Sequence, residues 1–193
     1  MLSIYNIIIK FFGFAIKIHS LYNQKSQQWI NGRKDIFYRL EKEITNNKNI
    51  VWFHCASHGE YEQVNQLISQ YKNNFPQDKI LLTFFSPSGF NNVKKINCID
   101  WIFYLPLDTQ KNAKKFIKLV MPKKVFFVKS EFWYNYMNQL SLYKIPLYHV
   151  SCVFDKKKFS ILSSFSTEIL SKSKHFFVQD KSSLDVLNSI NIK

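Results

Sequence analysis

The chain has 193 residues, of which 46% are hydrophobic and 21% charged, proportions that are typical of a folded domain and exclude a disordered chain. Only four glycines and five prolines are present, which excludes a glycine-rich phosphate loop and disfavours a sandwich or barrel with many tight turns. The net charge is +14, which indicates either an anionic partner, such as nucleic acid or a phospholipid surface, or a lysine-rich composition.

The N-terminal segment predicts an amphipathic helix. Polar residues recur there at alternating spacings of three and four, the periodicity of one helical stripe: Ser3, Asn6, Lys10, Gly13, Lys17 and Ser20. Two lysines inside a membrane-spanning helix would each cost about 2.5 to 3.5 kcal/mol, whereas from an interfacial helix they reach the headgroups. We therefore expect residues 1–22 to lie in a membrane surface, with no cleaved signal peptide. The alternative is a helix that docks on its own or a neighbouring domain.

Residues 23–193 predict a single α/β domain. A polar connector over 23–32 and a short basic helix over 33–44 precede six short apolar runs, at 50–55, 80–85, 101–105, 125–128, 147–150 and 175–178. These runs lack alternation, as parallel strands do when both faces of their sheet are covered. Apolar stripes at i, i+3, i+4 and i+7 begin at Val64, Ala113 and Trp133 and predict intervening helices. The pattern predicts a Rossmann-like parallel sheet with helices on both faces.

Cysteine and histidine give little sign of metal chemistry. Cys55, Cys98 and Cys152 are odd in number and widely spaced, which favours free thiols in a reducing compartment. His54, Cys55 and His58 lie close in sequence, but alternation along a strand directs residues 54 and 55 to opposite faces. Without a second pair of ligands, a zinc site is a weak hypothesis.

Polar side chains gather where the predicted strands end. Ligands of open parallel sheets bind at the carboxyl ends of the strands, which here lead into the segments 56–60, 86–89, 106–108 and 129–131. Glu60 lies at the first helix start, where its charge would repel the pyrophosphate of a dinucleotide. Two interpretations of Glu60 remain open: a base that accepts a proton from a substrate hydroxyl, or a charge that caps the following helix. Glu131 offers the same choice, with Trp133 and Tyr134 as stacking surfaces for a sugar or as core residues.

Four motifs occupy these strand ends: VWFHCASHGE at 51–60, LTFFSPSG at 82–89, YLPLD at 104–108 and FVKSEFWYN at 127–135. In order and spacing they resemble the N-terminal domain of the 3-deoxy-D-manno-octulosonic acid (Kdo) transferases, over essentially the whole chain. The resemblance implies the N-terminal half of a GT-B glycosyltransferase fold, preceded by the amphipathic helix. It also implies transfer of Kdo from CMP-Kdo to the lipid A precursor in lipopolysaccharide biosynthesis.

The resemblance assigns roles to individual residues. Glu60 matches the general base that deprotonates the acceptor hydroxyl, which attacks the anomeric carbon with inversion as CMP leaves. Glu131 matches a glutamate that is important for activity. Four further positions match residues on the acceptor side: Ser57, Gly59, Ser88 and Gly89. The resemblance implies no metal and no cofactor besides the donor substrate CMP-Kdo.

Location and partners follow from the same resemblance. It implies the cytoplasmic face of the bacterial inner membrane, with the lipid A precursor and an anionic membrane surface as partners. We expect no nucleic-acid partner, because most aromatic residues fall at core-like positions. The alternative is a membrane-surface binding protein without catalytic activity.

Two features depart from the family. His58 stands where the family usually has an apolar residue, so a titratable ring adjoins the predicted base. The chain also ends where a second Rossmann-like domain is expected, and in this fold that domain binds most of the donor. We therefore expect the missing C-terminal half to act as a separate subunit, or this chain to be a truncated product or a remnant.

Overall fold

The computed structural model describes residues 2–44, 47–93, 97–154 and 163–192. Its helices are α1 (Leu2–His19), α2 (Gln24–Gly32), α3 (Ile36–Ile44), α4 (His58–Asn74), α5 (Pro87–Asn92), α6 (Gln110–Val120), α7 (Tyr134–Leu142), α9 (Ser163–Leu170) and α10 (Lys181–Ser189). Its strands are β1 (Ile50–Cys55), β2 (Lys79–Phe84), β3 (Trp101–Tyr104), β4 (Lys124–Val128), β5 (Leu147–Cys152) and β6 (His175–Val178).

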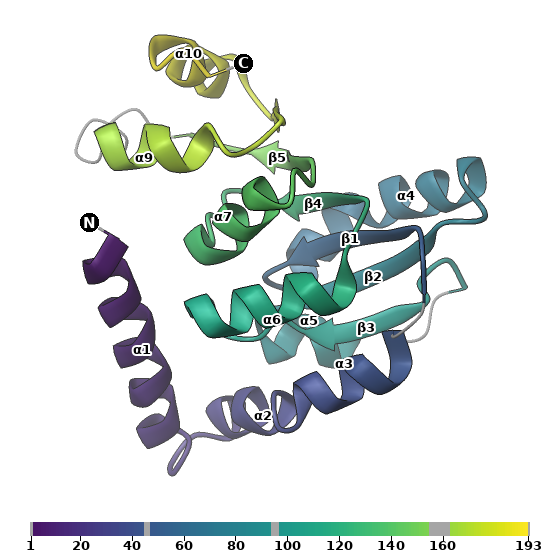
Figure 1. The fold of residues 1–193 in the computed structure, drawn as a ribbon, viewed down its shortest axis with the longest axis vertical. Coiled ribbons are helices and arrows are strands. Elements are labelled where there is room, and N and C mark those ends of the chain that lie inside the picture. The colour runs from purple at the N-terminus through teal and green to yellow at the C-terminus, as the bar shows by residue number, and fades with distance from the viewer. Residues whose placement is uncertain (1, 45–46, 94–96, 155–162, 193) are drawn as a thin grey trace.

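The six strands form one parallel sheet with the order β3-β2-β1-β4-β5-β6 (Figure 1). All residues of β1 are buried, as expected for a strand inside a covered sheet. The order reverses between β1 and β4, which is the Rossmann arrangement. The predicted fold class is thus confirmed, and each predicted apolar run is a strand whose ends lie within two residues of the expectation.

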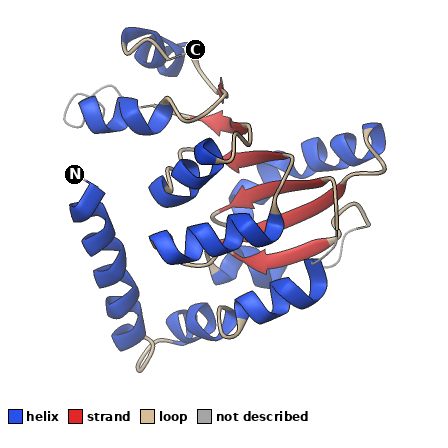
Figure 2. Cartoon of the chain, in the orientation of Figure 1, coloured by secondary structure: helices blue, strands red, loops and turns tan. Residues whose placement is uncertain are grey.

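Helices cover both faces of the sheet, as Figure 2 shows. On one face, α3, α6 and α7 pack around Trp52 of β1, whose ring lies 4.9 Å from that of Phe116 and 5.7 Å from that of Tyr136, between centroids. On the other face, α4 packs over β1 and β4, and the rings of Phe53 in β1 and Phe126 in β4 stack at 4.7 Å. Consecutive residues of β1 therefore belong to different cores, which fixes the register of the strand.

The predicted polar connector over 23–32 is wrong, because this segment forms α2. Asn23 caps the helix by accepting a hydrogen bond from the Ser26 N–H at 3.1 Å. The side chain of Trp29 is buried and packs α2 against the rest of the domain. With Trp29 and Ile30 as its only apolar side chains, α2 lacks the periodic stripe that predicts helices from sequence. Its N-cap residue was the available signal.

Helix α1 packs on the domain along a stripe that contains several of its polar residues. The Tyr5 hydroxyl donates to Asp108 at 2.5 Å, and the Asn135 amide donates to Asn6 at 2.9 Å. A Cβ atom at Gly13 would lie 2.7 Å from Leu107, so glycine permits this close approach. The outer face of α1 is apolar and exposed, with residues such as Ile4, Ile7, Ile8, Phe11 and Phe14 about 60% to 70% accessible. The presence of the predicted helix is confirmed, and it docks on its own domain, which was the alternative interpretation. Its position in a membrane surface stays a prediction; by length and composition alone the helix also suffices to cross a membrane.

Candidate active site

A cavity of about 400 Å³ lies where the strand order reverses. The chain leaves β1 for α4 on one face of the sheet and leaves β4 for α7 on the opposite face. These two loops diverge and leave a crevice between them, the usual ligand position in such sheets. The cavity is lined by Glu60, Gln63, Lys129, Ser130, Glu131, Val153 and Gln179. The structure therefore brings the two predicted glutamates together in one concave site.

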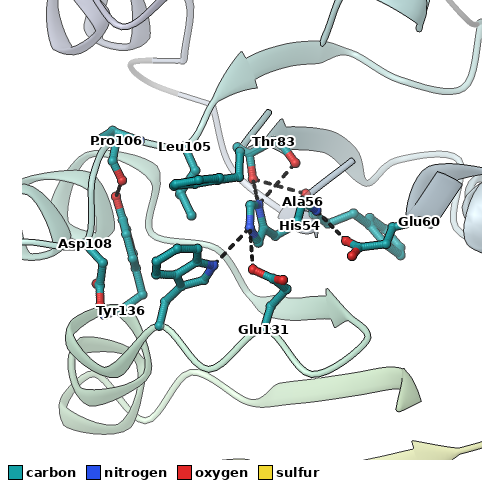
Figure 3. Close-up of polar contacts among 12 residues, drawn as sticks. His54, Ala56, Glu60, Thr83, Leu105, Pro106, Asp108, Glu131 and Tyr136 are labelled. Carbon is teal, nitrogen blue, oxygen red and sulfur yellow. Dashed lines mark hydrogen bonds and ion pairs between the residues drawn. The ribbon is translucent and has the colours of Figure 1, made fainter. Parts of the chain in front are cut away.

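Glu60 is both a helix-capping residue and a lining residue of this cavity. It is the third residue of α4, and its carboxylate accepts a hydrogen bond from the Ala56 N–H at 2.5 Å (Figure 3). Ser57 and Glu60 have the spacing of a capping box, although the Ser57 side chain makes no capping hydrogen bond. Only 8% of Glu60 is exposed. Burial raises the pKa of Glu60, while the Ala56 N–H and the charge of Lys129 act in the opposite direction.

Glu131 approaches Glu60 from the loop after β4. Burial, reinforced by the negative charge of Glu60, raises the pKa of Glu131 to about 7, while the nearby indole N–H of Trp133 acts in the opposite direction. Two carboxylates in one partly desolvated site do not ionise equally. The donors that face Glu60 favour its charged form, so Glu131 is the member of the pair that holds a proton near neutral pH.

A buried hydrogen-bond chain lies beside Glu131. The indole N–H of Trp133 donates to Nε2 of His54 at 3.3 Å, and Nδ1 of His54 lies 2.9 Å from the Thr83 hydroxyl. Because the indole needs an acceptor, the proton of the neutral ring belongs on Nδ1. Burial lowers the pKa of His54 to about 3, so its 4.0 Å approach to Glu131 is not an ion pair at neutral pH. Figure 3 shows His54 between Thr83 and Glu131.

The free energy of unfolding should fall as pH rises from about 5 to about 8. The folded-state pKa of Glu131, about 7, lies above the ordinary value of 4.5, so this stabilisation is present below the unfolded pKa and is lost as pH rises through the folded one. Its size is about 3 kcal/mol. Glu131→Gln cannot titrate and should show a shallower fall in urea unfolding across this range. An unchanged slope in Glu131→Gln, relative to the exposed control Glu62→Gln, would contradict the assignment.

The four predicted acceptor-side residues lie at the same edge of the sheet but outside the cavity lining. Ser57 is the N-cap residue of α4 and Gly59 is its second residue, where a Cβ atom would meet nothing within 4 Å. Ser88 is exposed in α5, where its hydroxyl lies 2.7 Å from that of Ser86. Gly89 is buried, and a Cβ atom there would lie 2.1 Å from the Phe84 ring. Their role in binding an acceptor stays a prediction.

These two glycines make a matched pair. Gly89→Ala forces a methyl group into the Phe84 ring and should destabilise the domain by about 1 to 3 kcal/mol. Gly59→Ala has open space in front of it and should leave stability unchanged or slightly higher, because alanine favours the helix. Urea unfolding measures both. Equal stability of the two variants would show that Phe84 does not require glycine at position 89.

The other residues considered from sequence near Glu60 and Glu131 make contacts outside the cavity. His58 faces Glu62 rather than Glu60, with Nε2 at 3.7 Å from its carboxylate. Tyr134 is buried, and Trp133 is the N-cap residue of α7 rather than part of its helical stripe, stacking on Phe85 at 4.9 Å. In the part of the chain that the structure describes, no group of three His, Cys, Asp or Glu side chains is arranged to hold a metal ion. Cys55, Cys98 and Cys152 are free thiols, as predicted.

Several lining residues were not singled out from sequence. The positive charge of Lys129 lowers the pKa of Glu60. The backbone of Lys129 is in the left-handed region, with a φ of 60°. Val153 and Gln179 follow β5 and β6, and Gln63 lies one turn beyond Glu60 on α4. The same strand-end rule that pointed to Glu60 would have found Val153 and Gln179, had it been extended to the last two strands.

The fold and the site together define a Rossmann-like α/β domain with a carboxylate pair at the reversal of the strand order. Residues 31–193 match the family model described as 3-deoxy-D-manno-octulosonic-acid transferase (kdotransferase). The chain belongs to this family.

Curated relatives carry the same name. A 3-deoxy-D-manno-octulosonic acid transferase of Aquifex aeolicus is 30% identical over 70% of this chain and 39% of its own length. One from Haemophilus influenzae is 36% identical over 50% of this chain and 23% of its own length. One from Rickettsia prowazekii is 22% identical over 97% of this chain and 42% of its own length. The chain thus spans less than half the length of these relatives.

Proposed function

We propose that this chain is the acceptor-side half of a Kdo transferase, which moves Kdo from CMP-Kdo to the lipid A precursor in lipopolysaccharide biosynthesis. Membership of the family supports the class of reaction. The observation that carries the proposal is the pair Glu60 and Glu131, which line one cavity at the strand ends.

Glu60 is the general base in this proposal. A hydroxyl of the acceptor sugar gives its proton to the Glu60 carboxylate while its oxygen attacks the anomeric carbon of Kdo. The bond from that carbon to the CMP phosphate breaks, CMP leaves with the electron pair, and the configuration inverts. A base must be ionised before it acts; burial raises the pKa of Glu60, and the Ala56 N–H and Lys129 oppose that rise.

Glu131 supplies the complementary group. With a pKa of about 7, it is protonated for much of the time at neutral pH and can donate a hydrogen bond to a substrate oxygen. The Trp133 indole N–H, which donates to His54, lies close enough to Glu131 to influence its pKa. Two carboxyl groups with separated pKa values are a recurrent arrangement for acid and base roles in one site.

We place the enzyme at the cytoplasmic face of the inner membrane. The exposed apolar face of α1 suits burial at a membrane interface, and the net charge of +14 suits attraction to anionic lipids, at about 1 kcal/mol for each basic residue near the surface. A lipid-linked acceptor would be presented at the same surface.

Reconstitution tests the proposal. The resemblance implies that CMP-Kdo binds mainly to a C-terminal domain. The purified chain should therefore bind lipid A-containing vesicles yet transfer little Kdo. A separately expressed C-terminal half should restore transfer from CMP-Kdo, measured as labelled Kdo in the lipid product. A second candidate, a membrane-binding protein without catalysis, is favoured by the exposed face of α1 alone; it predicts vesicle binding and no transfer in any mixture.

A further inference from the structure

A second and larger cavity lies between α1 and the domain. Its volume is about 700 Å³, and its lining comes from α1, α2, α3, the turn between α2 and α3, the segment between β3 and α6, and the start of α6. It shares no lining residue with the carboxylate site. We call it the α1 cleft. Its charged lining residues are Lys10, Lys17, Arg33 and Asp35.

The positive charges of the α1 cleft are not neutralised by the protein. Among the described residues, Lys10, Lys17 and Arg33 form no ion pair within 4.0 Å. The Arg33 guanidinium instead donates to three backbone carbonyls, those of Leu105, Trp29 and Phe85, at 2.7 to 3.1 Å. A guanidinium has five N–H donors, so two remain. Lys10 and Lys17 are exposed and Arg33 is half-buried. These three cations thus face one cleft whose described lining holds a single carboxylate, Asp35, and this excess of positive charge suits an anion.

An unsatisfied donor lies in the same lining. Trp29 is 7% exposed, and within the described part of the chain its indole N–H has no acceptor. The Arg33 guanidinium lies 3.6 Å from the centroid of the Trp29 ring. A buried N–H without a partner costs about 1 to 3 kcal/mol, and native proteins leave few such groups. An oxygen acceptor held beside Arg33 would remove this cost.

The α1 cleft also opens onto an apolar surface. Phe14 lines the cleft and is 60% exposed. The outer face of α1 continues from it through Phe11 and Ile7, with no described residue covering these side chains. A ligand with an anionic head and a hydrocarbon tail would therefore pair with the cations of the cleft and cover the apolar face of α1. A small free anion would pair with the cations only.

We propose that the α1 cleft binds the phosphate of an anionic membrane phospholipid. The phosphate lies among Arg33, Lys10 and Lys17 and accepts the Trp29 N–H, and the acyl chains run along the outer face of α1. Arginine suits the recognition of phosphate oxygens. The site is separate from the proposed transferase chemistry, and its occupation would fix the domain at one depth and orientation in the membrane.

Vesicle binding by the 193-residue chain tests the role of the lysines. Vesicles of phosphatidylcholine with added phosphatidylglycerol should bind the chain far more tightly than phosphatidylcholine alone. The double variant Lys10→Gln, Lys17→Gln should weaken that binding about 30-fold. The matched control is Lys114→Gln, Lys118→Gln, which removes the same charge from exposed positions on α6 outside the cleft. Equal losses in the two double variants would overturn the cleft site in favour of general surface charge.

The indole N–H resonance of Trp29 reports occupation directly. It is assigned by its absence in Trp29→Phe, which keeps an aromatic ring and lacks the indole N–H. Monomeric dihexanoylphosphatidylglycerol should shift this resonance, whereas uncharged octyl glucoside should not. No shift with the phospholipid would overturn the proposal. A shift produced by inorganic phosphate at equal concentration would also overturn it, because the site would then hold a free anion.

Discussion

Glu60→Gln is expected to lower Kdo transfer by about 100- to 10,000-fold in the reconstituted mixture, the usual contribution of a general base. Glutamine keeps an oxygen that can accept the Ala56 N–H, so the start of α4 should remain intact. It has no affinity for a proton in this pH range and cannot accept one from the acceptor hydroxyl. Initial rates with CMP-Kdo and the lipid A precursor measure the effect.

The matched control is Glu62→Gln, in the same turn of α4. The Glu62 side chain is 54% exposed and does not line the cavity, so this variant should keep normal transfer. Vesicle binding of Glu60→Gln should match that of the unmodified chain. Retained turnover in Glu60→Gln would remove Glu60 from the role of base and leave helix capping as its function.

Asp108→Ala should produce the largest loss of stability, about 3 to 5 kcal/mol. The Asp108 carboxylate is 1% exposed and accepts hydrogen bonds from the Asn135 and Tyr136 N–H groups at 3.1 and 3.0 Å. It thus caps α7 from another part of the chain, and through the Tyr5 hydroxyl it also holds α1. Alanine would leave all three donors buried without their acceptor.

Two comparisons separate the roles of Asp108. Tyr5→Phe removes the hydroxyl that donates to Asp108 and accepts from the Tyr134 N–H, and it should cost about 1 to 2 kcal/mol, while the Asn135 and Tyr136 N–H groups keep Asp108 as their acceptor. Asp185→Ala, on the exposed side of α10, should change stability by less than about 0.5 kcal/mol. Urea unfolding followed by far-ultraviolet circular dichroism measures each. An Asp108→Ala loss no larger than that of Tyr5→Phe would contradict the capping role.

The sheet was predictable from sequence because its strands are continuous apolar runs of strand length, such as the one over β1. Parallel strands end at one edge, so the meeting of Glu60 and Glu131 followed from placing each after a strand. The order of the strands did not follow from the pattern, and it is the order that makes β1 and β4 neighbours. The resemblance to the family supplied the roles that spacing alone left open.

Other features depend on contacts that no local pattern encodes. The chain through Thr83, His54 and Trp133 joins three separate segments, so its link to Glu131 is visible only in three dimensions. The direction of α1 was also hidden: an amphipathic pattern distinguishes two faces but does not say which one meets the domain. Here residues of the polar stripe, among them Asn6 and Gly13, face inward.

The inward polar stripe of α1 has a practical consequence for preparing the protein. The exposed apolar face of α1 will promote self-association in detergent-free buffer. Deleting α1 is the obvious way to prevent this. That truncation would strip Asp108 and Asn135 of their partners Tyr5 and Asn6 and open a hydrated gap in the domain. Substituting Ile7 and Phe11 with polar residues would improve solubility while leaving the docked side of the helix in place.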